Sequence, residues 1–351
     1  MSIPVVAFFN NKGGVGKTFL VYHLAWMYAD LGVRVVAADL DPQANLTAAF
    51  LDEDRLEELW PDGDHPKTIY GCIRPLLKGT GDIADPHIEN VFEDQQPALF
   101  GSPIALLVGD LSLSRFEDQL SDMWPRCLDR DERAFRAISA FWRIMQRAAE
   151  AHRADVILMD LGPNLGAINR AALIASDYVV VPLSPDLFSL QGLRNLGPTL
   201  REWRKEWHKR LQEWRELQKV EPVQNLQLPE GRMEPMGYIV LQHAVRMDRP
   251  VKAYDRWIAR IPTEYRNAVL NKPGESNIAV INDPDHLALL KHYRSLMPLA
   301  QEAHKPIFHL RPADGAIGAH TQAVQSAYRD FKQLAEEIAA RAQVPIDPLL
   351  I

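Results

Sequence analysis

Short apolar runs alternate with amphipathic helical segments along much of this chain. Parallel sheets bury both faces of their strands, so a continuous apolar run predicts a strand of that kind. Such runs lie at residues 4–9, 33–38, 104–108, 156–160, 178–183 and 235–242. Apolar positions at helical spacing predict helices at residues 17–31, 131–151, 199–219 and 320–341. The alternation predicts an α/β fold with a doubly wound, mostly parallel sheet that carries helices on both faces.

The remaining segments have weaker patterns. Residues 52–64 are strongly acidic and close with proline and glycine, which predicts a solvated helix and loop. Residues 243–300 are irregular and basic and then helical, and residues 305–310 predict a short edge element.

The length of the chain exceeds what a compact fold of this class needs. A doubly wound domain takes about 250 residues, and this chain has 351. We expect residues 1–351 to form a single domain. The excess then lies mainly in helical insertions at about 120–150, 201–232 and 250–300.

Composition narrows the class of protein. Hydrophobic residues make up 47% and charged residues 24%, which is typical of a globular core. No apolar stretch reaches the roughly 18 residues of a membrane span, and the first residues have no basic segment of a signal peptide. Cys72 and Cys127 form no Cys-x-x-Cys motif, which argues against a structural zinc site or a disulfide framework. These features predict a cytoplasmic protein.

A glycine-rich segment with two lysines separates the first predicted strand from the first predicted helix. Residues 12–18 are Lys-Gly-Gly-Val-Gly-Lys-Thr, and Asn11 stands where the strict P-loop pattern has its first glycine. Glycines let the backbone turn tightly and direct successive N–H groups at one point, so the loop and the helix N-terminus form an anion site. Lys17 would reach the β- and γ-phosphates, and the Thr18 hydroxyl would bind Mg²⁺. A glycine-rich turn with incidental lysines is the alternative.

Three aspartates stand at the ends of predicted strands. Asp39 and Asp41 follow the second strand, and Asp160 ends the strand at 156–160. Open α/β sheets bind ligands outside the carboxyl ends of their strands, and phosphoryl transfer needs groups that hold Mg²⁺ and position the attacking water. Acids at strand ends also cap helices or simply end strands, and these alternatives remain open for all three.

The motifs resemble those of a known family. The segment 11–18 resembles the deviant Walker A motif of the ParA/MinD family of P-loop ATPases, of the SIMIBI class, and within it the ParA/Soj-type partition ATPases. Residues 39–45 resemble the family's switch I, usually D-x-D-P-Q-x-N. Residues 156–166 resemble Walker B running into switch II, with Leu161 where the family more often has threonine.

The resemblance varies along the chain. It is strong over residues 4–50 and 154–200, plausible over 68–115 and weak over 201–351. The segment 179–193 also resembles a family segment, in which the turn passes near the nucleotide and the dimer face. A plain strand-to-helix loop is the alternative there.

The resemblance implies a Mg-ATP site. Asp160 with Thr18 would hold Mg²⁺, and Asp39 would support the metal shell or Asp41. Asp41 would orient the attacking water, and Lys12 would reach across a dimer to the partner's nucleotide. The nucleotide-binding residues implied are Asn11, Lys12, Gly13, Gly14, Val15, Gly16, Lys17, Thr18 and Phe19.

The resemblance also implies a function. The protein would be a slow ATP hydrolase that forms a homodimer with ATP, and an adaptor protein would stimulate hydrolysis. The ATP dimer would bind DNA nonspecifically in plasmid or chromosome partition, or in cargo positioning, and would then be nucleoid-associated. The net charge of −7 restricts such binding to a local patch.

Two basic segments are candidates for that patch. Residues 194–219 hold eight Lys and Arg with four Glu, and residues 245–272 hold seven Lys and Arg with three acids. The residues predicted to contact DNA are Arg246, Arg249, Lys252 and Arg256. A solvated charged face is the alternative for each segment. Three tryptophans at helical spacing in the first segment, Trp203, Trp207 and Trp214, favour packing over base stacking.

Two other classes of switch are alternatives to one that acts on DNA. A MinD-like or protein-only switch would recruit a partner without DNA, but the last predicted helix mixes both charges on its polar face and predicts core packing and no stable membrane insertion. An iron–sulfur relative such as the nitrogenase iron protein needs thiolates at the dimer axis, and neither cysteine lies near switch II.

Overall fold

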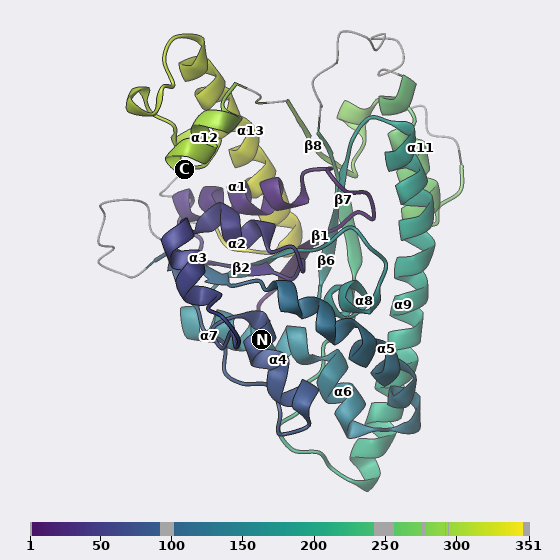
Figure 1. The fold of residues 1–351 in the computed structure, drawn as a ribbon. Helices are drawn as coiled ribbons and strands as arrows, with labels where there is room; N and C mark the ends of the chain where they lie inside the picture. Colours follow the sequence, from purple (N-terminus) through teal and green to yellow (C-terminus); the bar gives the residue numbers. More distant parts are fainter. Residues whose placement is uncertain are drawn as a thin grey trace.

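The computed structural model describes residues 2–91, 102–241, 256–274, 278–291, 293 and 295–346. These residues contain an eight-stranded sheet in the order β3-β4-β2-β5-β1-β6-β7-β8 (Figure 1). β3 is antiparallel to β4, and the other neighbouring strands are parallel. The strands are β1 Val5–Phe8, β2 Val35–Asp39, β3 Glu89–Val91, β4 Ile104–Leu107, β5 Val156–Asp160, β6 Tyr178–Leu183, β7 Glu234–Leu241 and β8 His286–Leu290. The prediction of a doubly wound, mostly parallel α/β sheet is confirmed.

Helices cover both faces of the sheet and form two apolar cores (Figure 1). Successive strand residues point to opposite faces, so Val5 and Ala7 of β1 belong to one core and Val6 and Phe8 to the other. One face carries α1 Lys17–Asp30, α2 Asn45–Phe50, α3 Glu53–Leu59, α12 Met297–Ala303 and α13 Ala319–Ala342. The other carries α4 Ile69–Lys78, α5 Glu117–Arg126, α6 Glu132–Ile138, α7 Ala140–His152, α8 Ala167–Ile174, α9 Leu187–Val220 and α11 Ile261–Glu264.

The two edge strands differ from the sequence prediction. β8 lies in a segment predicted to be irregular, and β3 was not predicted. The prediction of an edge element at 305–310 is wrong. Ile307–His309 forms a 3₁₀ turn, and Ile307 and Phe308 are buried in the core beside α13. An edge strand is covered on fewer sides than a central one, so it lacks the continuous apolar run that marks the six central strands.

The helix predicted at 131–151 is two helices, α6 and α7, joined at Ser139. The Ser139 hydroxyl donates to the Phe135 carbonyl at 2.7 Å and accepts from Arg143 Nε at 3.1 Å. A serine that bonds back to a carbonyl four residues earlier bends or interrupts a helix. Apolar periodicity continues through the break, so the sequence pattern alone joins the two.

The helix predicted at 199–219 is the second half of α9, which begins twelve residues earlier at Leu187. Pro198 lies inside it, and proline is unfavourable in a helix interior, so the sequence placed the start after it. The neighbouring Gly197 allows a close approach, since a Cβ there would lie 2.0 Å from the Ala268 carbonyl oxygen. Trp203, Trp207 and Trp214 are all buried, as their predicted packing role requires.

The contact at Gly197 predicts a large stability effect. In Gly197→Ala the new methyl group collides with the Ala268 carbonyl, and overpacking of this kind costs about 2–3 kcal/mol. The gain in helix propensity offsets only about 1 kcal/mol. We expect the midpoint of urea unfolding to fall, whereas Asn195→Ala on the exposed side of α9 stays near the wild-type midpoint. Equal midpoints for the two variants would show that the contact yields without cost.

Candidate nucleotide site

The topology brings together residues that are distant in the sequence. β2, β5 and β1 are neighbours, and their register pairs Asp39 with Asp160 and Phe8 with Asp160. The loop between β1 and α1 therefore lies beside both aspartates at the carboxyl edge of the sheet. Parallel strands connected by helices place the loop and the aspartates at the same edge of the sheet. This arrangement was predicted from the positions of the aspartates at strand ends.

The loop between β1 and α1 has the backbone that its glycines allow. Gly14 and Gly16 have φ values of 71° and 77°, in the left-handed region that disfavours side chains. A Cβ on Gly16 would also lie 2.9 Å from Leu241 Cδ1. Gly13 lies against Pro163, so the loop touches the segment after β5. This is the compact turn that lets a backbone surround an anion.

Lys17 is a buried cation at the start of α1. Its Nζ donates to the carbonyl oxygens of Asn10 at 3.3 Å and Lys12 at 3.4 Å. Burial lowers the pKa of Lys17, and the nearby charges of Asp160 and Asp41 oppose that shift. Among the residues that the structure describes, Lys17 forms no salt bridge. A buried ammonium held by backbone carbonyls is suited to receive a bound anion.

Thr18 and Asp160 form the second part of the site. The Thr18 hydroxyl donates to Asp160 Oδ2 at 2.6 Å. Burial raises the pKa of Asp160 to about 8, with a further contribution from the charge of Asp39. No group of three or more His, Cys, Asp and Glu within the described ranges is arranged to hold a metal by itself. Mg²⁺ commonly uses one or two protein oxygens and completes its shell with phosphate and water, so this pair fits such an ion.

Asp39 secures the segment that follows β2. It is fully buried, and its Oδ2 accepts from the Thr47 N–H and the Thr47 hydroxyl, both at 2.8 Å. Burial raises the pKa of Asp39 to about 7. Thr47 lies in the first turn of α2, so the helix-capping alternative holds in part for Asp39. Asp41 accepts from the Gln43 N–H at 3.0 Å and faces Gly162, since a Cβ there would lie 3.1 Å from Asp41 Oδ1.

Lys12 points away from its own loop. Its Nζ forms an ion pair with Asp186 and lies 3.5 Å from Ser189 Oγ. Asp186 also caps α9, because its Oδ1 accepts from the Ser189 N–H at 2.9 Å. Neither partner of Lys12 was predicted from the sequence, although Asp186 three residues before Ser189 is an N-cap pattern.

Asp186 should therefore restrain Lys12. In Asp186→Asn the ion pair is lost while the amide oxygen still caps α9. We expect little change in stability, and faster trypsin cleavage or acetylation of Lys12 in the protein without nucleotide. The measurement is the rate of Lys12 modification by mass spectrometry. Lys209, which is exposed on α9, serves as the internal reference. Unchanged Lys12 reactivity relative to Lys209 would contradict the restraint.

Residues missed by the sequence analysis hold the segment after Asp160. The Glu117 carboxylate of α5 accepts from the backbone N–H groups of Ala167 and, at 2.9 Å, Ile168 at the N-terminus of α8. Asn169 Nδ2 donates to the carbonyl oxygens of Gly162 at 2.8 Å and Asn164 at 2.6 Å. The backbone of this turn is thus held from two helices. Only the tertiary fold brings Glu117 there, since it lies 50 residues from Ala167.

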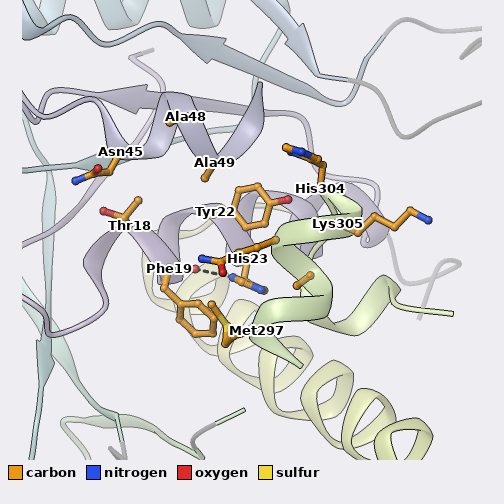
Figure 2. A pocket seen from close by; sticks show the side chains of 12 residues that line it. Thr18, Phe19, Tyr22, His23, Asn45, Ala48, Ala49, Met297, His304 and Lys305 are labelled. Atoms are coloured by element: carbon orange, nitrogen blue, oxygen red, sulfur yellow. Dashed lines mark hydrogen bonds between the residues drawn. The ribbon is translucent and has the colours of Figure 1, made fainter. Parts of the chain in front are cut away.

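Two further predicted nucleotide-binding side chains have distinct surroundings. Figure 2 shows Phe19 beside His23, and their ring centroids are 4.1 Å apart. Asn11 Oδ1 is buried without a hydrogen-bond partner among the described residues. Asn10, which precedes the loop, is held at both ends of its side-chain amide, because Nδ2 donates to the Pro182 carbonyl oxygen and Oδ1 accepts from the Lys12 N–H.

The predicted DNA contacts are mostly beyond the structure. Arg246, Arg249 and Lys252 lie outside the described residues, whereas Arg256 is exposed and its guanidinium lies 4.6 Å from the Trp257 ring centroid. The other basic segment, residues 194–219 in α9, has several arginines turned inward. They donate to backbone carbonyls of neighbouring elements and comprise Arg201, Arg204 and Arg210.

The last predicted helix is α13, and it packs against the sheet. Phe331, Leu334 and Ile338 are fully buried, which confirms its predicted packing role. None of the described helices combines the length and apolarity that crossing a membrane requires.

Comparison with known proteins agrees with this geometry. A family model described as an AAA domain matches residues 3–213. The chromosome-partitioning ATPase Soj of Thermus thermophilus is 28% identical over 212 residues, covering 59% of this chain and 65% of Soj. The sporulation initiation inhibitor protein Soj of Bacillus subtilis is 27% identical over 197 residues, covering 56% and 64%. The matches span between 42% and 65% of the length of the curated relatives.

Solved structures share the fold over nearly the whole chain. A protein from Corynebacterium diphtheriae superposes with a TM-score of 0.67 at 23% identity, covering 97% of this chain and 99% of that one. A variant of the Cyanothece protein McdA in complex with ATP superposes with a TM-score of 0.55 at 14% identity, covering 98% of each chain. At these identities the likeness concerns the fold alone.

Proposed function

We propose, from the premise that this chain belongs to the AAA-domain family and is a P-loop ATPase of the ParA/MinD type, that it is an ATP-driven positioning switch. It binds Mg-ATP at the carboxyl edge of the sheet, forms a homodimer with ATP, and hydrolyses ATP slowly until an adaptor protein stimulates it. The observation that carries this proposal is the buried Lys17 beside the Thr18–Asp160 pair.

The residues present fit a nucleotide with Mg²⁺. Lys17 is a buried cation with no salt bridge among the described residues, and Asn11 Oδ1 is a buried acceptor without a partner there. The Thr18 hydroxyl and the Asp160 carboxylate are hard oxygen donors, the class that Mg²⁺ prefers. The left-handed conformations of Gly14 and Gly16 give the loop the tight turn that can direct backbone N–H groups at an anion.

The chain's own groups would divide the work of hydrolysis. Lys17 and the backbone of residues 11–19 would hold the phosphates, and Thr18 with Asp160 would hold the metal. Mg²⁺ would neutralise charge that develops on the phosphate oxygens. Asp41 orients the attacking water beside Gly162. Asp39 accepts hydrogen bonds from the Asp41 N–H and from Thr47, and from this position it would support Asp41 or the metal shell.

Lys12 supports a role for the homodimer. In the single chain its side chain points away from its own loop and pairs with Asp186 at the start of α9. When Lys12 separates from Asp186, its ammonium becomes available at the edge of the site. There it could bind the phosphates of the nucleotide in the partner protomer. Loss of the γ-phosphate on hydrolysis then removes the anion that holds the two copies together.

DNA is the proposed surface on which the dimer acts. The net charge of −7 requires a local basic patch, for which we propose Arg246, Arg249, Lys252 and Arg256. The chromosome-partitioning ATPase among the relatives supports DNA as the surface on which the dimer acts. A DNA-bound dimer would place the protein at the nucleoid in the cytoplasm. The continuous eight-stranded sheet supports one ATPase domain over residues 1–351, elaborated at about 120–150, 201–232 and 250–300.

Light scattering followed by a DNA mobility shift tests the proposal. The protein is sized with Mg-ADP and with a slowly hydrolysed ATP analogue and Mg²⁺, and each form is mixed with nonspecific duplex DNA. We expect a dimer only with the ATP analogue, and a shift that weakens by at least tenfold between about 50 and 200 mM salt. A dimer that ignores DNA would leave a protein-only switch. A monomer under both conditions would refute the switch.

A further inference from the structure

A cavity of about 470 Å³ lies beside the phosphate loop on the outer side of α1. Its walls come from α1, α2 and α12, and Figure 2 shows the Tyr22 side chain between them. Volumes of about 300–1,000 Å³ are typical of small-molecule sites. The walls from α1 and α2 belong to the part of the chain where the family resemblance is strong, whereas α12 belongs to the part where it is weak.

The aromatic walls of the cavity are fixed by contacts within the protein. His23 Nδ1 lies 2.8 Å from the Phe19 carbonyl, and its Nε2 accepts from the Ile307 N–H at 3.2 Å. The His23 ring also stacks on Phe331 with centroids 5.1 Å apart. Tyr22 packs against Phe50 at 4.8 Å between centroids. The rings are therefore held in place before any ligand arrives, which lowers the cost of binding.

The chemistry of the lining selects a neutral, flat molecule. Phe19, Tyr22, Met297 and small alanines form an apolar surface, and the amides of Asn45 and Gln301 offer hydrogen bonds. Burial lowers the pKa of His23 to about 3, so its ring is uncharged near neutral pH. The Lys305 ammonium pairs with Asp314 at 3.0 Å, and Figure 2 shows its side chain pointing away from the cavity. An anionic ligand would find little compensation here.

The cavity borders the parts of the site that respond to the nucleotide. Ala48 and Ala49 of α2 line it, and they follow Thr47, whose N–H and hydroxyl hold Asp39. Thr47 Oγ1 also accepts from the Gly109 N–H at 2.8 Å. On the opposite wall stands Thr18, the partner of Asp160. A molecule wedged against α2 would shift Thr47 and loosen the hold on Asp39.

We propose that this cavity, which adjoins the nucleotide-binding segment at Thr18 and Phe19, is a regulatory site for a neutral aromatic small molecule with hydrogen-bonding groups, and that its occupancy slows ATP hydrolysis by displacing α2. The regulatory part rests on the proposed ATPase function, whereas binding to the cavity does not.

Fluorescence titration with N-phenyl-1-naphthylamine, a neutral aromatic probe, tests the site in the full chain. We expect one probe per chain in the wild type and at least tenfold weaker binding in Ala49→Trp and in Met297→Trp, which fill the cavity from opposite walls. Ala340→Trp, on the exposed side of α13, is the control and should bind like the wild type. Circular dichroism confirms that each variant is folded. Wild-type affinity in both filled variants would overturn the site.

Two further measurements separate this site from the nucleotide site and from the proposed function. Lys17→Ala, which removes the phosphate-binding ammonium, should keep wild-type probe affinity, and loss of probe binding there would assign the probe to the nucleotide site. Saturating probe should lower wild-type ATP turnover at least threefold and leave Ala49→Trp unaffected. Probe binding with unchanged turnover would overturn the regulatory role. Probe binding in a chain that hydrolyses no ATP would preserve the site and refute the proposed function instead.

Discussion

Lys17→Ala is expected to abolish binding of Mg-ATP. The ammonium is buried, is held by two backbone carbonyls at 3.3 and 3.4 Å, and forms no salt bridge among the described residues. Its charge-assisted bonds to phosphate oxygens would contribute on the order of 3 kcal/mol, because neither water nor another cation replaces them. Affinity should fall at least about 100-fold. Isothermal titration calorimetry with Mg-ATP measures the change.

The controls show whether the loss of ATP affinity comes from the missing phosphate contact, from the change in net charge or from misfolding. Lys209→Ala removes an exposed lysine of α9 and should bind Mg-ATP like the wild type. Lys17→Ala should not melt at a lower temperature without nucleotide, since it removes a buried charge whose pKa is lowered by burial. Retained ATP affinity in a folded Lys17→Ala protein would contradict the assignment of the loop.

Asp41→Ala is expected to keep ATP binding and lose hydrolysis. Asp41 lies at the start of the segment that Asp39 secures, and it faces the turn at Gly162 where the attacking water would stand. Its removal leaves Lys17, Thr18 and Asp160 in place, so the phosphates remain bound. Turnover should fall by about 100- to 1,000-fold, the range for a group that positions a water. Phosphate release measures turnover, and light scattering should show a persistent dimer with ATP.

Asp54→Ala supplies the matched control, because Asp54 is an exposed acid on the neighbouring helix α3. It should hydrolyse ATP at the wild-type rate and return to monomer as ATP is consumed. Asp41→Ala with normal turnover would show that another group positions the water.

The sequence predicted the parts of this protein that depend on local patterns. Continuous apolar runs identified the central strands, and the carboxyl ends of those strands indicated where Asp39, Asp41 and Asp160 would meet. The strands at the two edges were missed, since exposure removes the apolar signal there. The start of α9 was misplaced because Pro198, which lies inside the helix, looks like a helix boundary in the sequence.

Contacts between elements were beyond sequence patterns. The ion pair of Lys12 with Asp186 joins residues 174 positions apart, and the cap of Glu117 on α8 spans 50 positions. Either acid could serve many partners, and only the packing of α5 and α9 against the sheet selects one. The cavity beside α1 likewise depends on α12, whose sequence has no motif.

The length of α9 could amplify a small movement at its first turn. Its first turn is joined to the phosphate loop through Asp186 and Lys12, and it continues for 34 residues to Val220. At 1.5 Å per residue the helix spans about 50 Å. A tilt of about 5° around its first turn would carry the far end through about 4 Å. A shift at Asp186 can therefore be too small to disturb the sheet. The far end of α9 would still move by about the length of a side chain.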